Sequence, residues 1–291
     1  MRFLVDVPPF RPMFAAAALV AVAAIAPVVS VQADTPATIS LSPHQALYTL
    51  SLKQSRGNVS VNNASGRILY NFSGNRCEGY TSDFRQLSEL DVSEGNDITS
   101  DLRSSSWESA DGKTYRFNIE TKTNDEDSSL VDGVAERKGD AITVKLKQPV
   151  AKEFTIGADT IFPTEQVKRI IIAAREGKSL LELRVYDGSD GGEKIYNTFA
   201  VIGREIAADK LPADAGGSND ELKKLRRWPV TVSYYDSAGK SSSSEQTPVY
   251  AMSFELYDNG VSRALVLDYN DFVISGAMSK YDTKQSKPCK P

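Results

Sequence analysis

Residues 113–120 read KTYRFNIE, and they decide the fold class because apolar and polar side chains alternate along them. Tyr115, Phe117 and Ile119 would face one side of a strand, while the polar residues between them face the other. A period of two is typical of a half-buried antiparallel β-strand. Residues 141–147 (AITVKLK) and 228–234 (WPVTVSY) repeat the pattern. The chain is therefore expected to be mainly β.

Similar strand-like segments follow one another through most of the chain. They cover residues 46–55, 58–72, 79–92, 97–107, 129–138, 180–187, 194–203, 247–257, 260–269 and 271–279. Turn residues separate many of them, and Asn259-Gly260 is the clearest two-residue hairpin. A sheet of about a dozen antiparallel strands must curl or close to remove its edges. We expect a curled or broken antiparallel β-barrel.

Helix signals are few. Residues 164–176 carry an apolar stripe at the i, i+3, i+4, i+7 spacing of a helix, formed by Val167, Ile170, Ile171 and Ala174. Thr164 is the expected N-cap and Gly177 the expected end, and a curled sheet around this hydrophobic helix would bury the stripe. A capping box at residues 218–221 predicts a second, short helix that ends at Arg226 and Arg227.

The composition limits the classes of function. The 291 residues are 41% apolar and 25% charged, which is ordinary for a soluble globular protein. A net charge of −4 lacks the basic excess of a nucleic-acid-binding protein, so we expect no nucleic-acid partner. The single histidine, His44, leaves too few ligands for a histidine-based metal site. The sequence indicates no catalytic residue, cofactor or metal, and we do not expect an enzyme.

The N-terminus resembles an export signal. Residues 12–32 carry no charge, and small residues at Val31 and Ala33 predict cleavage after Ala33. The alternative is an uncleaved membrane anchor, although the apolar run is short and Pro27 interrupts it. We expect residues 1–33 to be a signal peptide and residues 34–291 a single periplasmic domain that does not span the membrane. A domain boundary near residues 205–218 remains the alternative.

Two cysteines, Cys77 and Cys289, lie in the exported part of the chain. An oxidising compartment and an even count favour a disulfide bond. The bridge would close a very long loop and remove roughly 5 kcal/mol of chain entropy from the unfolded state. A redox-active or metal-binding pair is the alternative, although the C-x-x-C spacing that favours redox cycling is absent.

An ordered set of short motifs resembles one known family. The motifs are GRILY at 66–70, CEGY at 77–80, SWE at 106–108, DGK at 111–113, FPTE at 162–165, VYDGS at 185–189, KIY at 194–196, RRWPV at 226–230 and LYDNGVSR at 256–263. Together with Cys289 near the end, they resemble the cell-envelope integrity EipB family of alphaproteobacterial periplasmic proteins. The resemblance covers essentially the whole chain after residue 33, and the set is specific although no single motif is.

The resemblance implies a β-spiral, which is a broken, oval barrel wrapped around a hydrophobic helix. It also implies a disulfide between an early strand and the C-terminus, matching Cys77 and Cys289. The family is associated with envelope integrity and with a periplasmic tetratricopeptide-repeat protein. Its fold is similar to that of the lipoprotein carriers of the Lol pathway. No activity is assigned to it, so the resemblance implies no catalytic residue.

Two surfaces are candidates for binding. Arg226 and Arg227 beside Trp228 could contact an acidic partner or lipid phosphates, or could simply end a helix before a core residue. The helix 164–176 could be core, or it could move and leave an apolar cleft for an acyl chain. We expect a partner-binding protein of the envelope; the alternatives are a carrier or chaperone for an envelope lipid or lipoprotein, and a carboxylate-dependent hydrolase.

Overall fold

The structure is a computed structural model. It describes residues 39–56, 61–93, 97–124, 127–207, 209–210, 212–216, 219–238, 247–286 and 288–289. The expected signal peptide and its cleavage site lie outside these residues, so export remains a prediction. Within the described ranges, no helix has the length and apolar character needed to cross a membrane.

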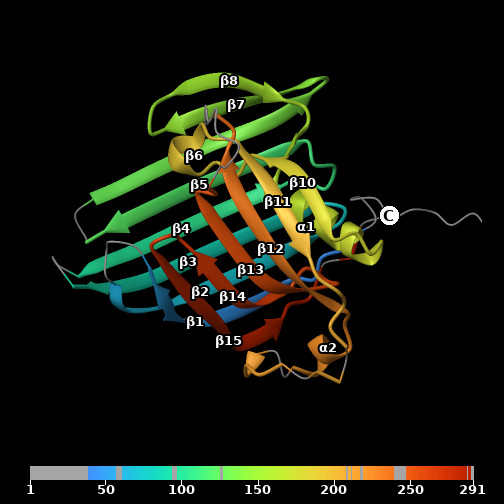
Figure 1. The fold of residues 1–291 in the computed structure, drawn as a ribbon. Helices are drawn as coiled ribbons and strands as arrows, with labels where there is room; N and C mark the ends of the chain where they lie inside the picture. The colour runs from blue at the N-terminus through green and yellow to red at the C-terminus, as the bar shows by residue number, and fades with distance from the viewer. Residues whose placement is uncertain are drawn as a thin grey trace, which may run out of the picture. The chain divides into compact units, whose positions relative to one another are not determined.

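Fifteen strands of the described chain form one sheet, almost entirely antiparallel (Figure 1). The strands are β1 (His44–Ser55), β2 (Val61–Asn75), β3 (Gly79–Val92), β4 (Ile98–Glu108), β5 (Thr114–Thr123), β6 (Asp127–Lys138), β7 (Ala141–Gln148), β8 (Lys152–Gly157), β9 (Thr160–Ile161), β10 (Leu180–Val185), β11 (Tyr196–Ile202), β12 (Arg227–Asp236), β13 (Tyr250–Tyr257), β14 (Ser262–Asp268) and β15 (Phe272–Thr283). The helices are α1 (Pro163–Arg175), α2 (Asp220–Lys223) and the 3₁₀ turn η1 (Asp190–Gly192).

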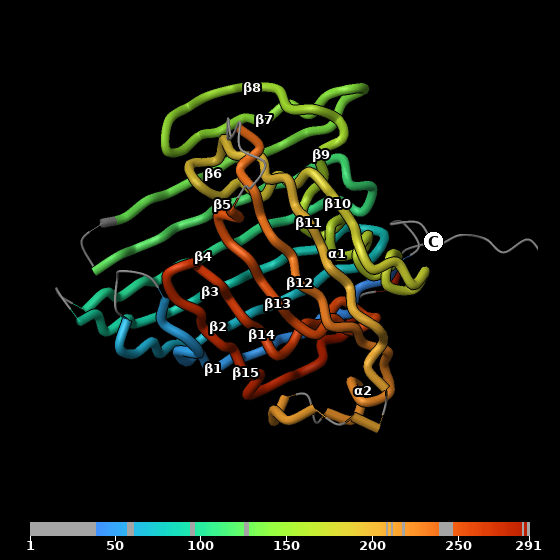
Figure 2. Tube along the Cα trace, in the orientation of Figure 1, coloured from blue at the N-terminus to red at the C-terminus, as the bar shows by residue number. Residues whose placement is uncertain are grey.

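The order of the strands explains how the sheet curls. From one edge to the other, the sheet runs from β8 to β1 in reverse chain order, continues with β15, and then runs in reverse order from β15 to β9. The first and last strands therefore pair in the middle of the sheet, from His44 opposite Thr283 to Ser55 opposite Phe272. The two edges, β8 and β9, are separated by only two residues of chain. The result is a nearly closed barrel with one seam, where these edges diverge (Figure 2), and the expected fold class is confirmed.

The alternating segments become strands because their apolar face turns inward. In β7, Ile142, Val144 and Leu146 are buried while the intervening lysines are exposed. The sequence did not indicate β8 or β9. β8 carries only Phe154 and Ile156 on its inward face, and β9 has two residues, so neither shows a sustained period of two.

Two apolar clusters fill the barrel. The larger joins α1 to the inner faces of β1–β3 and β11–β15, so the helix lies between two walls of the sheet. The smaller packs Phe162 and Tyr186 against the inner faces of β5–β8, next to the seam. The β10–β11 connection, which contains Tyr186 and η1, contacts β6 beside this second cluster.

Both helices differ from expectation at their ends. α1 begins at Pro163, and Phe162 is its N-cap without a side-chain hydrogen bond, so the prediction of Thr164 as N-cap was wrong. Proline favours the first helical position because its fixed φ suits the helix and it has no N–H to satisfy. α2 ends at Lys223, capped at its start by Asn219, so it does not reach Arg226.

Candidate functional site

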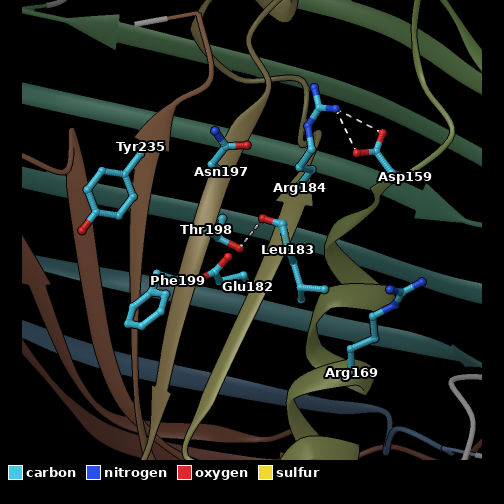
Figure 3. A pocket seen from close by; sticks show the side chains of 9 residues that line it. All are labelled: Asp159, Arg169, Glu182, Leu183, Arg184, Asn197, Thr198, Phe199 and Tyr235. Atoms are coloured by element: carbon cyan, nitrogen blue, oxygen red, sulfur yellow. Dashed lines mark hydrogen bonds and ion pairs between the residues drawn. The ribbon is translucent and has the colours of Figure 1, made fainter. Parts of the chain in front are cut away.

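Two adjoining cavities lie along the seam. The outer one has a volume of about 830 Å³ and lies beside β10–β12; the inner one, of about 540 Å³, lies beside the first turns of α1. Asp159, in the β8–β9 turn, and Arg169, on α1, line both cavities. We call the pair the seam groove. Figure 3 shows the residues of its outer part, contributed by β10, β11, β12 and α1.

The outer part combines aromatic and charged side chains. Phe199 and Tyr235 are both half-buried and come from neighbouring strands. Beside them, the guanidinium of Arg184 holds the carboxylate of Asp159 at 2.9 Å (Figure 3). Aromatic surface next to a polar, charged rim is the composition found in protein–protein interfaces. This part of the groove therefore has the chemistry of a protein-binding surface.

The inner part is built around a buried carboxylate at the start of α1. Glu108, at the end of β4, accepts hydrogen bonds from the backbone N–H groups of Thr164 at 2.8 Å and Glu165 at 3.1 Å. It thereby supplies the cap that α1 lacks locally, and the helix dipole favours its negative charge. Burial nevertheless raises the pKa of Glu108 to about 7, against the opposing effect of these bonds.

Lys168 is the second buried charge of the groove. Its side chain is on α1 and the residue is only 6% exposed. In the described part of the chain its ammonium has no hydrogen-bond acceptor; it lies 5.1 Å from the ring centroid of Tyr80. Burial lowers the pKa of Lys168, while the charges of Glu108 and Glu165 oppose that shift. The charges of Lys168 and Glu108 therefore each oppose the effect that burial has on the pKa of the other group.

The apolar stripe of α1 is mostly core. Ile170, Ile171 and Ala174 are at most 4% exposed, whereas Val167 is half-buried. The stripe meets the inner faces of both walls of the sheet. The side of α1 that carries this stripe therefore offers little exposed apolar surface to a ligand.

The three residues Arg226, Arg227 and Trp228 do not form one surface. Arg226 is half exposed, pairs with Glu205 at 2.8 Å and stacks on the indole of Trp228. Arg227 is buried and donates to Glu255 at 2.9 Å, and Trp228 is 2% exposed in the core. Of these three residues, only Arg226 is exposed enough to contact a partner. Strand β12 begins at Arg227, and both Arg227 and Trp228 are buried.

The structure joins Cys77 and Cys289 by a disulfide bond across 212 residues of sequence. Cys77 lies in the β2–β3 turn, so the bond ties the end of the chain to that hairpin. His44 is buried at the start of β1, where its Nδ1 lies 2.8 Å from the carbonyl oxygen of Ser42. Burial lowers its pKa. Within the described residues no group of His, Cys, Asp or Glu could hold a metal.

Sequence reasoning missed Glu108 and Lys168. Glu108 contacts α1 across 56 residues of sequence, a contact that no local pattern reveals. Lys168 lies beside the apolar stripe, one residue after Val167, and a lysine on an amphipathic helix is normally solvated. The only available signal was the position of Glu108 inside one of the family motifs.

A nearly closed barrel, with a disulfide bond from Cys289 to the β2–β3 turn, places the chain among barrel-like proteins. The family model described as EipB-like matches residues 35–285, and the chain belongs to this family. It is 32% identical over 259 residues to the cell envelope integrity protein EipB of Brucella abortus (strain 2308), covering 88% of this chain and 90% of that protein.

The fold is also similar to a solved structure. The crystal structure of a beta-barrel-like protein of a domain of unknown function, DUF1849, from Brucella abortus shares 30% sequence identity and a TM-score of 0.77 with this chain. The match covers 85% of this chain and all of that one. The disulfide bond and the envelope-integrity relative together suggest an exported protein.

Proposed function

We propose that this chain is a non-enzymatic periplasmic protein that maintains envelope integrity by binding a partner protein in the seam groove. The relative named for envelope integrity supports the cellular role. The observation that favours protein binding is the contrast between the two candidate surfaces. The apolar stripe of α1 is mostly buried in the core, whereas a cavity of about 830 Å³ lies at the seam and is lined by aromatic and charged groups.

The burial of α1 weighs against an apolar cleft. Exposing a buried isoleucine costs about 1.5–3 kcal/mol. Moving α1 outward would expose Ile170 and Ile171 together, as well as the inner faces they cover. An acyl chain would have to offset several kcal/mol before it bound with net affinity. A surface groove requires no such opening.

The proposal is tested by binding to the periplasmic tetratricopeptide-repeat protein that the family resemblance implies as partner. We expect Phe199→Ala with Tyr235→Ala to weaken binding at least about tenfold, since aromatic anchors carry much of an interface's energy. Leu87→Ala is the control, because Leu87 is also an exposed apolar side chain, 43% accessible, but lies on β3 outside the groove. Equal affinities for both variants would refute the groove as the binding site.

A lipid or lipoprotein carrier is the second candidate. It is favoured by the half-buried Val167 and Ile172 on α1, which leave part of the helix less tightly packed. Native mass spectrometry of the protein purified from its own periplasm distinguishes it: a copurifying lipid supports the carrier. A carboxylate-dependent hydrolase is the weakest of the three candidates. The buried carboxylate of Glu108 already accepts the hydrogen bonds that cap α1.

A further inference from the structure

The inner cavity of the seam groove contains a buried cation that no acceptor of the described chain satisfies. Lys168 is only 6% exposed, and it lines this cavity of about 540 Å³. The described chain has a few fully enclosed polar side-chain atoms without a hydrogen-bond partner, and the Lys168 ammonium is not one of them. The ammonium therefore remains accessible, and the cavity is the space that it reaches.

A buried ammonium without an acceptor requires a physical explanation. Lysine is almost never fully buried unless it is paired, because taking a charge out of water costs free energy. The ring of Tyr80, 5.1 Å away, compensates in part through a cation–π contact. Glu108 does not supply the acceptor, because its two carboxylate oxygens accept from the N–H groups of Thr164 and Glu165. An acceptor from outside the chain would complete the site.

The charge balance of the inner cavity favours an anion. Three carboxylates that line it each have a cation of their own: Asp159 pairs with Arg184, Glu165 with Arg169 and Asp111 with Lys113. Of the charged groups that line the cavity, Lys168, Arg137 and Glu108 are left without an ion pair among the described residues. Burial raises the pKa of Glu108 to about 7, so this carboxyl is partly protonated near neutral pH. Two cations therefore face at most one unpaired negative charge.

Arg137 is the second cation of the cavity. Its guanidinium donates hydrogen bonds to the carbonyl oxygens of Ala158 and Thr160 and lies 5.6 Å from the ring centroid of Phe162. These contacts hold the guanidinium in the wall of the cavity and use two of its five N–H donors. Arg137 lies on β6 and Lys168 on α1, so two separate elements contribute cations to one cavity.

These features fit a group with a single negative charge. A phosphate monoester carries about −1.5 to −2 charges at neutral pH, and the carboxylates that line the cavity would repel the second charge. A carboxylate carries one charge, and its oxygens accept strong hydrogen bonds from ammonium and guanidinium groups. A neutral apolar group would leave Lys168 without an acceptor, which is costly for a buried charge. A carboxylate therefore fits the cavity best.

The outer cavity indicates the source of the carboxylate. Asp159 and Arg169 line both cavities, so the two parts of the seam groove adjoin. A partner that contacts Phe199 and Tyr235 in the outer part therefore lies beside the inner part, and one acidic group of that partner can enter it.

We propose that the inner cavity receives one carboxylate of the partner bound in the seam groove, either an acidic side chain or the C-terminus, and that Lys168 and Arg137 bind it. The source of the carboxylate rests on the proposed function, whereas the carboxylate site itself does not. Lys168 is then a specificity-determining residue, because it selects a partner with an acidic group at the position that reaches the inner cavity.

The carboxylate site is tested by NMR titration of the purified protein, followed on the backbone amide signals of α1. The probes are N-acetylglycine, which mimics the C-terminus of a peptide, its neutral amide N-acetylglycinamide, and inorganic phosphate. We expect saturable shifts with N-acetylglycine at a dissociation constant of about 10 mM or tighter. The amide should cause no saturable shift, and phosphate should bind at least about tenfold more weakly than N-acetylglycine.

Two variants should change the affinity for N-acetylglycine in opposite directions. Lys168→Met keeps a side chain of similar length without the charge, and it should weaken binding at least about tenfold. Glu108→Gln removes the competing negative charge and should strengthen binding roughly two- to tenfold, a gain that partial unfolding does not imitate. Lys178→Met is the matched control, because Lys178 lies just after α1, is exposed and pairs with Glu176; it should leave binding unchanged.

Equal responses to N-acetylglycine and its amide, undiminished binding by Lys168→Met, or tighter binding of phosphate would each overturn the carboxylate site. Binding of the partner is measured separately, and Lys168→Met should weaken it at least about tenfold. If Phe199→Ala with Tyr235→Ala weakens partner binding and Lys168→Met does not, the partner's carboxylate is refuted while the proposed function stands. If none of these variants affects partner binding, the proposed function fails, and the titration with N-acetylglycine still decides whether the carboxylate site exists.

Discussion

Glu108→Gln should change how the stability of the protein depends on pH. Burial raises the pKa of Glu108 from 4.5 to about 7 in the folded protein. A carboxyl whose pKa is raised by folding contributes stability that is fully present below its unfolded pKa and is lost as the pH rises through the folded pKa. The gap from 4.5 to about 7 corresponds to roughly 3 kcal/mol.

Glutamine removes this titration while keeping one oxygen acceptor for the N–H groups of α1. The variant carries a constant penalty of about 1–3 kcal/mol, because one of those groups loses its acceptor. Relative to the unsubstituted protein, however, it should gain roughly 3 kcal/mol between about pH 4.5 and about pH 8. Contributions from other groups cancel in this difference wherever they do not interact with Glu108.

The assay is urea unfolding followed by tryptophan fluorescence at several pH values, with extrapolation to water. Asp111→Asn is the matched control. The hydroxyl of Ser109 holds the pKa of the exposed Asp111 below its usual value, so its contribution is lost only as the pH falls through that low pKa. The control difference should be flat over the same range. A flat difference for Glu108→Gln would refute the reasoning that burial dominates at this site.

Three further predictions concern the fold. Replacing Cys77 and Cys289 by serine should lower the free energy of unfolding by about 2–5 kcal/mol, and an unchanged melting temperature after chemical reduction of the native protein would contradict this. Ile171→Ala should cost about 2–5 kcal/mol in urea unfolding, because Ile171 is fully buried between α1 and the sheet; a cost below 1 kcal/mol, on the scale of exposed sites, would show that α1 is loosely packed. Gly188→Ala should be more destabilising than Gly139→Ala by about 1–3 kcal/mol, since both glycines have positive φ but only the first would collide with a buried aromatic ring; equal melting temperatures would refute the clash.

The sequence indicated the strands because burial of one sheet face imposes a period of two on the residues. In KTYRFNIE the buried Tyr115 and Phe117 are the residues that the alternation places inward. The sequence did not predict β9, because a two-residue strand shows no period. Helix α2 is shorter than expected, because strand pairing begins at Arg227. Local patterns report local burial, and they fail where a distant element decides the outcome.

The candidate sites were less predictable for the same reason. The cap of α1 depends on Glu108, which the fold brings to the helix from another strand. The seam groove forms where the edge strands β8 and β9 diverge, and this position depends on how the whole sheet curls rather than on any local sequence pattern.

The pairing of β1 with β15 makes the fold dependent on the last part of the chain. These strands are separated by more than 200 residues, yet each is the other's neighbour in the centre of the sheet. Contacts so distant in sequence slow folding, because the loop entropy must be lost before the contact is gained. A chain emerging N-terminus first would hold β1 with one open edge until β15 arrived. The barrel therefore forms only once the chain is complete as far as β15, and a chain interrupted before that point keeps an unpaired edge at β1 that favours aggregation.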